Sequence, residues 1–247
     1  MNDKIILIPD VHGRTFWKEA VEQTCDKIIF LGDYLDPYGY EGITEEDAIA
    51  NLEDILKFAE NRKDCKLLLG NHDCGYIWSD VCSSRRSRLY ATDISHMFNE
   101  NFDKFDLAYQ IEQGDKKFLI SHAGIHKKWL DIIIDELGIN SKNINIPDLL
   151  NNWLHCNEYD KEYFLGMYSY FRGGWSGGSF GSCVWADVRE WSSELDNRKE
   201  NDKLGYYQIF GHTQLEEDPI IQDTFACIDV RRYFILENGQ LIDSKKE

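Results

Sequence analysis

The sequence predicts an α/β protein whose first part forms a parallel β-sheet. Apolar runs without polar alternation are typical of strands buried on both faces, and they occur at Lys4–Ile8, Lys27–Leu31 and Lys66–Leu69. Segments with helical character separate these runs, at Arg14–Gln23 and from Thr44 to about Asn61. This β-α-β-α-β order predicts parallel pairing with right-handed crossovers.

The elements that follow are predicted from their local patterns. The helix at Thr44 has a capping box, because Asp47 lies three residues downstream. The polar segment Asp80–Phe105 is predicted to be helical. A turn at Gly114 and Asp115 then joins two strands of a β-hairpin, Leu107–Gln113 and Lys117–Ser121.

The second half is predicted to carry a helical insertion at about residues 126–172, followed by more strands. Its helices are Lys127–Leu137, Pro147–Leu154 and Lys161–Tyr170. Gly173–Gly181 is a glycine- and serine-rich loop, too short for a domain linker. The remaining strands are Tyr206–Phe210, Phe225–Asp229, Tyr233–Leu236 and Gln240–Ile242. We expect residues 1–247 to form a single domain.

Composition limits the classes of partner and compartment. The 247 residues carry a formal net charge of -17, which disfavours general binding to nucleic acid or to anionic membranes. No apolar run reaches the roughly 20 residues of a membrane span, and the first strand leaves no room for a signal peptide. The seven cysteines are dispersed without a C-x-x-C pair, so we expect reduced thiols and a cytoplasmic location.

Polar side chains follow five of the predicted strands. They are Asp10 and His12, Asp33 and Asp36, Asn71 and His72, His122, and His212. Open α/β sheets place their sites at the carboxyl ends of the strands. In extended backbone, Asp10 and His12 would point the same way. A lone histidine at a strand end is more often structural, but five such endings in series indicate a shared site.

The ligand types favour a pair of metal ions. Asp10, His12, Asp33, Asn71, His122 and His212 supply three imidazoles, two carboxylates and one amide oxygen. This is too many for a single ion that also binds substrate, but it suits two ions bridged by a carboxylate. The mixed nitrogen and oxygen set favours Mn, Fe, Zn or Co over Ca or Mg. Such a pair generates a bridging hydroxide near neutral pH.

These motifs resemble those of the calcineurin-like metallophosphoesterases. The matching blocks are Asp10-x-His12, Gly32-Asp33-x-x-Asp36, Gly70-Asn71-His72-Asp73, Ser121-His122-Ala123-Gly124 and Gly211-His212. The resemblance implies a four-layer α/β/β/α sandwich with a helical insertion. It implies that Asp10 and His12 bind the first metal, that Asp33 bridges, and that Asn71, His122 and His212 bind the second.

The resemblance also implies a catalytic pair. His72 would be the general acid that protonates the leaving oxygen, and Asp36 would orient it. A histidine beside a carboxylate is held protonated, and a leaving alkoxide needs a proton. The alternatives are a hydrogen bond from His72 to its own turn, and a helix cap or turn role for Asp36.

Within the superfamily, the chain is similar to the serine/threonine-phosphatase and bis-nucleosyl-tetraphosphatase branch. It departs from that branch at Pro37 and Leu69, where an arginine is usual, and at Asp73, where glutamate is frequent. Candidate replacements for the phosphate-binding arginines are Arg14, Arg172 and Arg189, each of which could instead form a surface ion pair. A further arginine cluster, Arg85, Arg86 and Arg88, lies in the polar segment.

Other candidate residues have competing interpretations. Gln214 stands where many members carry a second histidine on the first metal, so it is either a weak ligand or an outer-shell residue. His126 and His155 are expected to be structural. Four tryptophans could stack a base but are more often core residues: Trp153, Trp175, Trp185 and Trp191. The Gly173–Gly181 loop lacks the lysine and spacing of a P-loop.

We therefore expect a metal-dependent phosphatase that hydrolyses phosphate monoesters of proteins or small molecules through a metal-bridged hydroxide. The alternatives are a dinucleoside-polyphosphate hydrolase and a catalytically silent metal-binding module. Less favoured alternatives are a nuclease, a cyclic-nucleotide phosphodiesterase and a repair phosphatase that acts on a nucleic-acid end. The expected cofactors are two metal ions, Mn, Fe or Zn, and the expected partner is a phosphorylated substrate.

Overall fold

The computed structural model describes residues 3–60, 62–78, 81, 84–139, 144–156, 160–173, 180–192 and 203–246. Within these residues the first sheet has the strand order β11-β10-β1-β2-β3-β4. Its central strands run parallel: β1 (Ile5–Ile8), β2 (Lys27–Phe30), β3 (Cys65–Leu68) and β4 (Phe105–Asp106). The strands β10 (Phe234–Glu237) and β11 (Gln240–Asp243) extend one edge in antiparallel pairing.

The second sheet is mixed and has the order β5-β6-β7-β9-β8 within the described residues. The hairpin of β5 (Ala108–Gln113) and β6 (Lys116–Ser121) is antiparallel, as the sequence predicts. The next strands, β7 (Tyr207–Phe210) and β9 (Phe225–Cys227), run parallel to β6. A short strand that the sequence did not predict, β8 (Ile220–Ile221), pairs antiparallel with β9.

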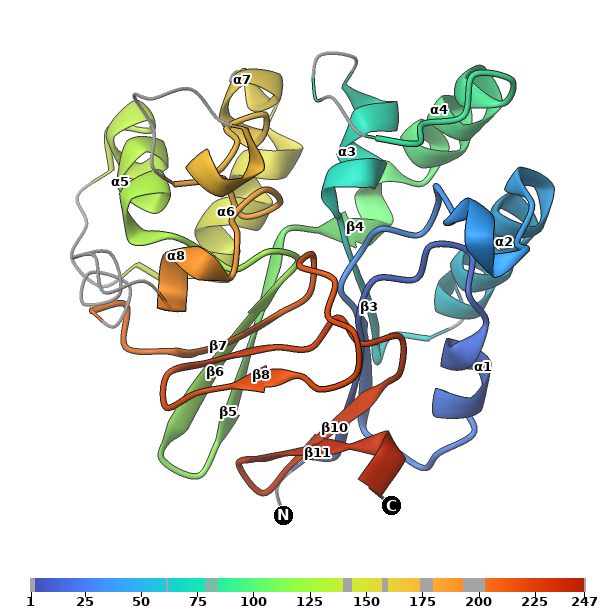
Figure 1. The fold of residues 1–247 in the computed structure, drawn as a ribbon. Helices are drawn as coiled ribbons and strands as arrows, with labels where there is room; N and C mark the ends of the chain where they lie inside the picture. Colours follow the sequence, from blue (N-terminus) through green and yellow to red (C-terminus); the bar gives the residue numbers. More distant parts are fainter. Residues whose placement is uncertain are drawn as a thin grey trace.

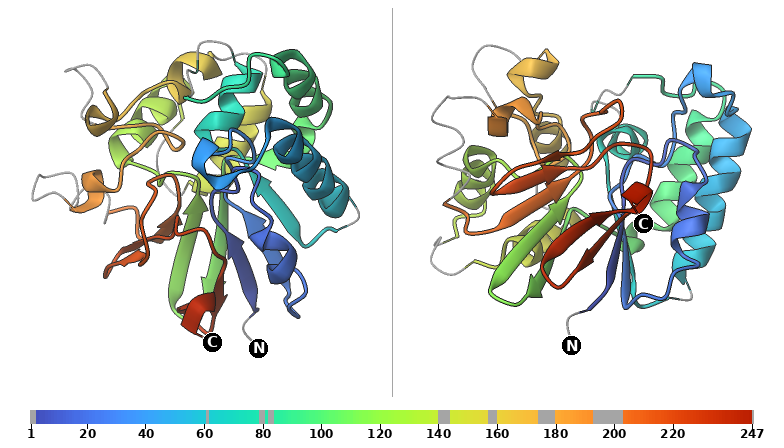
Figure 2. Two further views of the ribbon diagram at one scale, coloured as in Figure 1. Left: turned by 45° about the vertical axis from the view of Figure 1, so that its right-hand side comes forward. Right: turned by 60° about the horizontal axis from the view of Figure 1, so that its bottom comes forward.

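Helices cover the outer faces of the two sheets (Figures 1 and 2). Beside the first sheet lie α1 (Phe16–Ala20), α2 (Glu45–Glu60) and α4 (Ala91–Glu100). Beside the second lie α5 (Lys127–Glu136), α6 (Ile146–His155), α7 (Lys161–Leu165) and α8 (Arg189–Ser192). Figure 1 shows α3 (Asn71–Ile77) between the two groups. The predicted fold class, with two sheets packed between helices, is therefore confirmed.

The core explains why the first strand is apolar on both faces. Ile5 and Leu7 pack in one buried cluster with second-sheet residues such as Phe118 and Ile209. The alternate residues, Ile6 and Ile8, belong to the cluster that contains the helix residues Trp17 and Leu52. Because successive side chains of a strand point to opposite faces, β1 needs apolar residues at every position.

Several predicted boundaries are wrong. The segment Asp80–Phe105 is not one helix: α4 covers only Ala91–Glu100, and β4 begins at Phe105. The third insertion helix, predicted to reach Tyr170, ends at Leu165, and a 3-10 turn (Tyr170–Arg172) follows. The helix α3 was not predicted. None of the helices described here has the length and apolarity that a membrane span requires.

Candidate metal centre

The candidate site lies where the loops that follow β1, β2, β6 and β7 meet the start of α3. Its residues are almost fully buried: Asp10, His12, Asp33, Asp36, Asn71, His72, His122 and His212. The structure thus brings together all eight residues that the sequence placed at strand ends.

The side chains of His12, Asp33 and His212 are oriented by tight turns and not by extended strands. His12, Asp33 and His212 have φ values of 45°, 53° and 62°, in the left-handed region that non-glycine residues rarely adopt. The expectation that Asp10 and His12 share a direction because the backbone is extended is therefore wrong. The strand ends at Ile8, and the N–H of His12 donates to the Asp33 carbonyl oxygen at 2.7 Å, which turns the chain.

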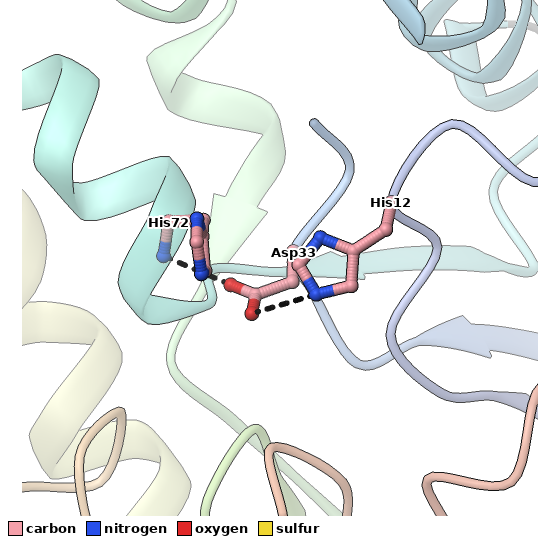
Figure 3. A group of neighbouring side chains, drawn as sticks. All are labelled: His12, Asp33 and His72. Carbon is pink, nitrogen blue, oxygen red and sulfur yellow. Dashed lines mark hydrogen bonds and ion pairs between the residues drawn. The ribbon is translucent and has the colours of Figure 1, made fainter. Parts of the chain in front are cut away.

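Asp33 occupies the centre of the cluster. Its Oδ2 lies 3.6 Å from Nε2 of His12 and 3.6 Å from Nε2 of His122. Its Oδ1 accepts the backbone N–H of His72 at 2.9 Å. Figure 3 shows His12 and His72 approaching this carboxylate from two sides. The Asp33 carboxylate thus faces the imidazole of His12, which follows β1 in the first sheet, and that of His122, which follows β6 in the second.

Backbone carbonyl groups fix which nitrogen each of these imidazoles presents. Nδ1 of His12 donates to the Leu35 carbonyl at 2.6 Å, and Nδ1 of His122 donates to that of Leu31 at 2.8 Å. Nε2 of each ring then faces Asp33 and is the nitrogen available to a metal ion. Burial lowers the pKa of His12 to about 3, so this ring is neutral, which is the form that binds metal.

The residues fit a cation, because several side-chain atoms that can bind a metal converge at one point. Nε2 of His122 lies within hydrogen-bond distance of two of them, 3.1 Å from Oδ1 of Asn71 and 3.2 Å from Nδ1 of His212. His212 Nε2 is buried without a hydrogen-bond partner among the described residues, and burial lowers the pKa of this ring well below its ordinary value. Imidazole, amide and carboxylate groups gathered this closely have the composition of a metal site.

Two overlapping groups of side chains have the spacing of metal ligands. One contains His12, Asp33 and His72, and the other contains Asp33, His122 and His212. Asp33 is common to both. Asp10 joins the cluster through Oδ1, which accepts the backbone N–H of His212 at 2.9 Å.

Glycines allow the carboxylates to approach the backbone. A Cβ atom at Gly70 would collide with Oδ1 of Asp33, and one at Gly211 would collide with Oδ1 of Asp10. Only glycine fits at these two positions. This explains why a glycine precedes the polar residues in the third and fifth motifs.

His72 and Asp36 form a buried hydrogen-bonded pair. His72 Nδ1 lies 2.6 Å from Oδ2 of Asp36, and the hydroxyl of Tyr76 donates to the other carboxylate oxygen. Burial opposes the charged form of His72, but Asp33 and Asp36 outweigh burial and raise its pKa. The rings of His72 and His12 lie 5.0 Å apart, edge to face. The pair is thus next to the metal-ligand cluster and holds a proton there.

Buried carboxylates concentrate negative charge at this site. Burial raises the pKa of Asp10, and neighbouring Asp33 raises it further, while His122 lowers it. In Asp33, the imidazoles of His122, His72 and His12 overcome burial and lower the pKa. Asp229 was not predicted as a site residue. It is buried, and burial and Asp10 raise its pKa well above the ordinary value. The apolar run that precedes Asp229 could have revealed it.

The three candidate arginines are already paired with carboxylates. Arg14 Nε donates to Glu41 at 2.8 Å, and its Nη1 reaches the Asp10 carbonyl at 3.2 Å. Arg172 and Arg189 each donate to Asp187 at 2.7 Å. Arg172 also reaches the hydroxyl of Thr213 and the carbonyl of His212, so it lies nearer the cluster than its exposed neighbour Arg189.

Other candidates lie apart from the cluster. Gln214 is exposed and donates to the Tyr40 hydroxyl at 3.3 Å. His126 accepts the N–H of Lys128 at the start of α5, and His155 contacts the Phe105 carbonyl. Trp153 and Trp191 are core residues. Trp185 packs edge-on against His212 with ring centres 5.4 Å apart. Trp175 and most of the Gly173–Gly181 loop are outside the described residues.

The family model of the calcineurin-like phosphoesterases matches residues 4–216. No curated protein sequence matches the chain.

Two solved structures are similar to this one. A protein serine/threonine phosphatase from Saccharomyces cerevisiae, described as similar to human phosphatase PP5, aligns with TM-score 0.54 and 15% identity over 98% of this chain and 80% of its own. At this identity the alignment supports the fold alone. A metallophosphoesterase from Sphaerobacter thermophilus aligns with TM-score 0.29 and 19% identity over 50% of this chain and 48% of its own, too weakly to carry an argument.

Proposed function

Because the chain belongs to the calcineurin-like phosphoesterase family and is a metal-dependent phosphoesterase, we propose that it hydrolyses phosphate monoesters at a centre of two metal ions. The observation that carries this proposal is the position of Asp33. Its Oδ2 lies 3.6 Å from Nε2 of both His12 and His122, as a carboxylate shared between two cations would. His12 and His122 belong to two separate groups with metal-ligand spacing that share only Asp33, which favours two ions over one.

The donor atoms divide into two sets around this carboxylate. Asp10 and His12 would hold one ion, and Asn71, His122 and His212 the other. When bound, the ions supply Lewis acidity that activates water and polarises the phosphoryl oxygens. Mn, Fe and Zn suit this nitrogen and oxygen set best. The carbonyls of Leu35 and Leu31 keep the two ligating Nε2 atoms in place.

His72 is proposed to donate a proton to the leaving oxygen. Asp36 binds its Nδ1, so the other ring nitrogen carries the proton toward the cluster. Tyr76, which donates to Asp36, keeps that carboxylate oriented. Although burial opposes the charged form, Asp33 and Asp36 raise the pKa of His72, which favours the protonated ring that the general acid needs.

Arg172 is the proposed phosphate ligand among the three arginines named from the sequence. Its guanidinium already contacts the backbone of His212 and the side chain of Thr213, so it lies beside the second set of donors. Asp187 holds it in that position. Arg14 and Arg189 stay as weaker candidates, and Gln214 is proposed as an outer residue. The dispersed cysteines fit a reducing, cytoplasmic setting, which is also a proposal.

The test measures metal content and substrate range together. Protein loaded with Mn, Fe or Zn is assayed on an aryl phosphate, a phosphopeptide and diadenosine tetraphosphate, and bound metal is counted by mass spectrometry. We expect two ions per chain and hydrolysis of the monoesters. Preference for diadenosine tetraphosphate would favour the dinucleoside-polyphosphate alternative. Full activity with one ion would overturn the two-metal proposal.

A further inference from the structure

The segment between α3 and α4 carries three arginines that the mechanism above does not use. They are Arg85, Arg86 and Arg88. Unlike the arginines discussed above, none of the three forms an ion pair with a carboxylate among the described residues. Each of the other six arginines that the structure describes has a carboxylate partner. The positive charge of Arg85, Arg86 and Arg88 is therefore available to an anionic ligand.

Arg85 lies beside the catalytic pair. Its Nε donates to the Asp36 carbonyl at 3.1 Å, and the side chain of the same aspartate binds His72. Its guanidinium carbon is 3.9 Å from the ring centre of Tyr38, and that ring lies 5.1 Å from the ring of His12. Arg85 is thus connected to the metal-ligand cluster in two ways. One runs through Asp36 and His72, and the other through Tyr38 and His12. Arg85 is exposed, and its Nη1 donates to Ser84 Oγ at 3.3 Å.

The three arginines line an open hollow of about 1100 Å³. Glu45 and Glu46 also line it, but each is engaged: Ser87 Oγ donates to Glu45, and the Tyr90 hydroxyl donates to Glu46. Positive groups therefore outnumber negative ones along this wall. A hollow with this lining attracts a second negative charge.

The position of Arg85 says which part of a substrate would reach this hollow. Arg85 lies over the Tyr38 ring, which packs against His12, so the end of the hollow that Arg85 lines borders the metal-ligand cluster. In a phosphate monoester, any second anionic group is carried by the leaving group. We propose that Arg85 and Arg88 bind an anionic group on the leaving group, so that the preferred substrates are small phosphate esters carrying a second phosphate or carboxylate. This proposal rests on the proposed function.

The experiment compares ligands with one and two negative groups. Metal-loaded protein, freed of excess metal, is titrated by calorimetry with propylphosphonate and with 1,3-propanebisphosphonate, which cannot be hydrolysed. The variants are Arg85→Met and Arg85→Met with Arg88→Met, since both side chains are exposed. Arg86 is left intact because its guanidinium lies over the Tyr76 ring. The control is Arg62→Met, an arginine paired with Asp64 at the opposite end of the sheet.

We expect wild type to bind the bisphosphonate at least about tenfold more tightly than the monophosphonate, in line with charge-assisted contacts. Arg85→Met should reduce this ratio, the double variant should bring it close to one, and Arg62→Met should keep it. High salt should also reduce it. A ratio near one in wild type, or an unchanged ratio in the double variant, would overturn the proposal.

A kinetic comparison separates this proposal from the proposed function. Wild type and variants are assayed on propyl phosphate and on 1,3-propanediol bisphosphate. We expect kcat/KM to favour the bisphosphate in wild type and the preference to fall by about tenfold in the double variant. If wild type hydrolyses neither ester, the proposed function fails, while the calorimetric ratio still decides whether the arginines bind a second anion.

Discussion

Asp33 shows how much one residue contributes to this site. Its side chain faces two imidazoles, and its carbonyl accepts the N–H groups of Val11 and His12. Its backbone adopts φ 53°, a conformation that tertiary contacts must maintain. The residue therefore joins the loops after β1 and β2 as well as facing the imidazoles of His12 and His122.

Replacing this carboxylate should disable the centre. In Asp33→Asn, one oxygen becomes an amide that donates hydrogen bonds and cannot be shared between two cations. We expect fewer than two bound ions per chain and loss of hydrolysis, measured by metal analysis and an aryl phosphate assay. Asp115→Asn, in the exposed hairpin turn, is the control and should behave like wild type. An Asp33→Asn protein that kept both ions would refute the shared position.

His72→Ala should separate proton transfer from metal binding. The variant removes the proposed acid but leaves Asp33, Asn71 and the other donors in place, so metal content should stay normal. Turnover should fall by roughly 10²–10⁴ on alkyl phosphates, and least on aryl phosphates, whose leaving groups need little protonation. His96→Ala on the exposed face of α4 is the matched control. Loss of metal in His72→Ala would contradict the acid assignment.

The sequence could predict where the polar residues lie but not how they are aimed. Each motif follows an apolar run, so its place at a strand end could be read from the pattern. The left-handed turn at His12 depends on the Asp33 carbonyl, which comes from a different strand. The sequence showed the arginine cluster that contains Arg85, but the contact between Arg85 and Asp36 was hidden, because it spans 49 residues of sequence.

At the scale of elements, α3 depends on a single buried side chain. The carboxylate of Asp73 accepts three backbone N–H groups, from Gly70 and Asp33 at 2.8 Å and from Tyr34 at 3.0 Å. It thereby caps the helix and fixes the neighbouring loop. The helix was missed because Asn71–Ile77 has no apolar periodicity to reveal it.

Asp73→Asn should therefore destabilise the fold. The amide offers one acceptor oxygen in place of two, and its own N–H groups would face backbone donors. We expect the free energy of unfolding in urea to fall by about 1–3 kcal/mol. Asp103→Asn, at an exposed position near β4, serves as the control. Equal stability of the Asp73 variant and wild type would show that these hydrogen bonds contribute little.

The segment before α4 shows why the helix predicted over Asp80–Phe105 was too long. Arg85 has φ 62°, and the N–H of Ser87 donates to the Tyr76 hydroxyl at 2.8 Å instead of to a helical carbonyl. The hydrogen bond joins residues 11 positions apart, across the end of α3. The local pattern of polar residues gives no sign of it, so the helix was expected to begin too early.

A second element-scale prediction concerns Glu190 in α8. Its carboxylate accepts N–H groups from Gly181 and Asp187, and burial raises its pKa to about 7, against 4.5 for the exposed group. Between these pH values the folded chain keeps a proton that the unfolded chain releases. The free energy of unfolding should then fall as pH rises from about 4.5 to 7, by at most about 1.4 kcal/mol per pH unit.

Comparison with Glu190→Gln isolates this contribution. His126 faces Glu190 at 3.8 Å, and burial lowers its pKa to about 3, so it adds an opposite dependence below pH 6.5 that both proteins share. We expect the free energy of unfolding of Glu190→Gln, relative to that of wild type, to increase as pH rises from about 4.5 to 7. Parallel pH profiles from urea unfolding would contradict a raised pKa at Glu190.

At the scale of the whole molecule, the sequence of apolar runs and helical segments predicted the first sheet far better than the second. The parallel order of β1, β2 and β3 follows from alternating strands and helices. The second sheet pairs Phe118 of β6 with Tyr207 of β7, across the whole helical insertion. No local signal indicates that register, and only the family resemblance led us to expect two sheets.

Metal binding should stabilise the whole fold, because it neutralises buried acids where the two sheets meet. Asp10, Asp33 and Asp229 lie close enough to perturb one another's ionisation. A cation that binds only the folded state at about 100 times its Kd adds about 2.7 kcal/mol to the free energy of unfolding. Thermal unfolding of chelator-treated protein should therefore shift upward when manganese is added. Asp33→Asn should show a smaller shift, since its donor set is incomplete. An equal shift in both proteins would mean that manganese stabilises the fold from somewhere other than this cluster.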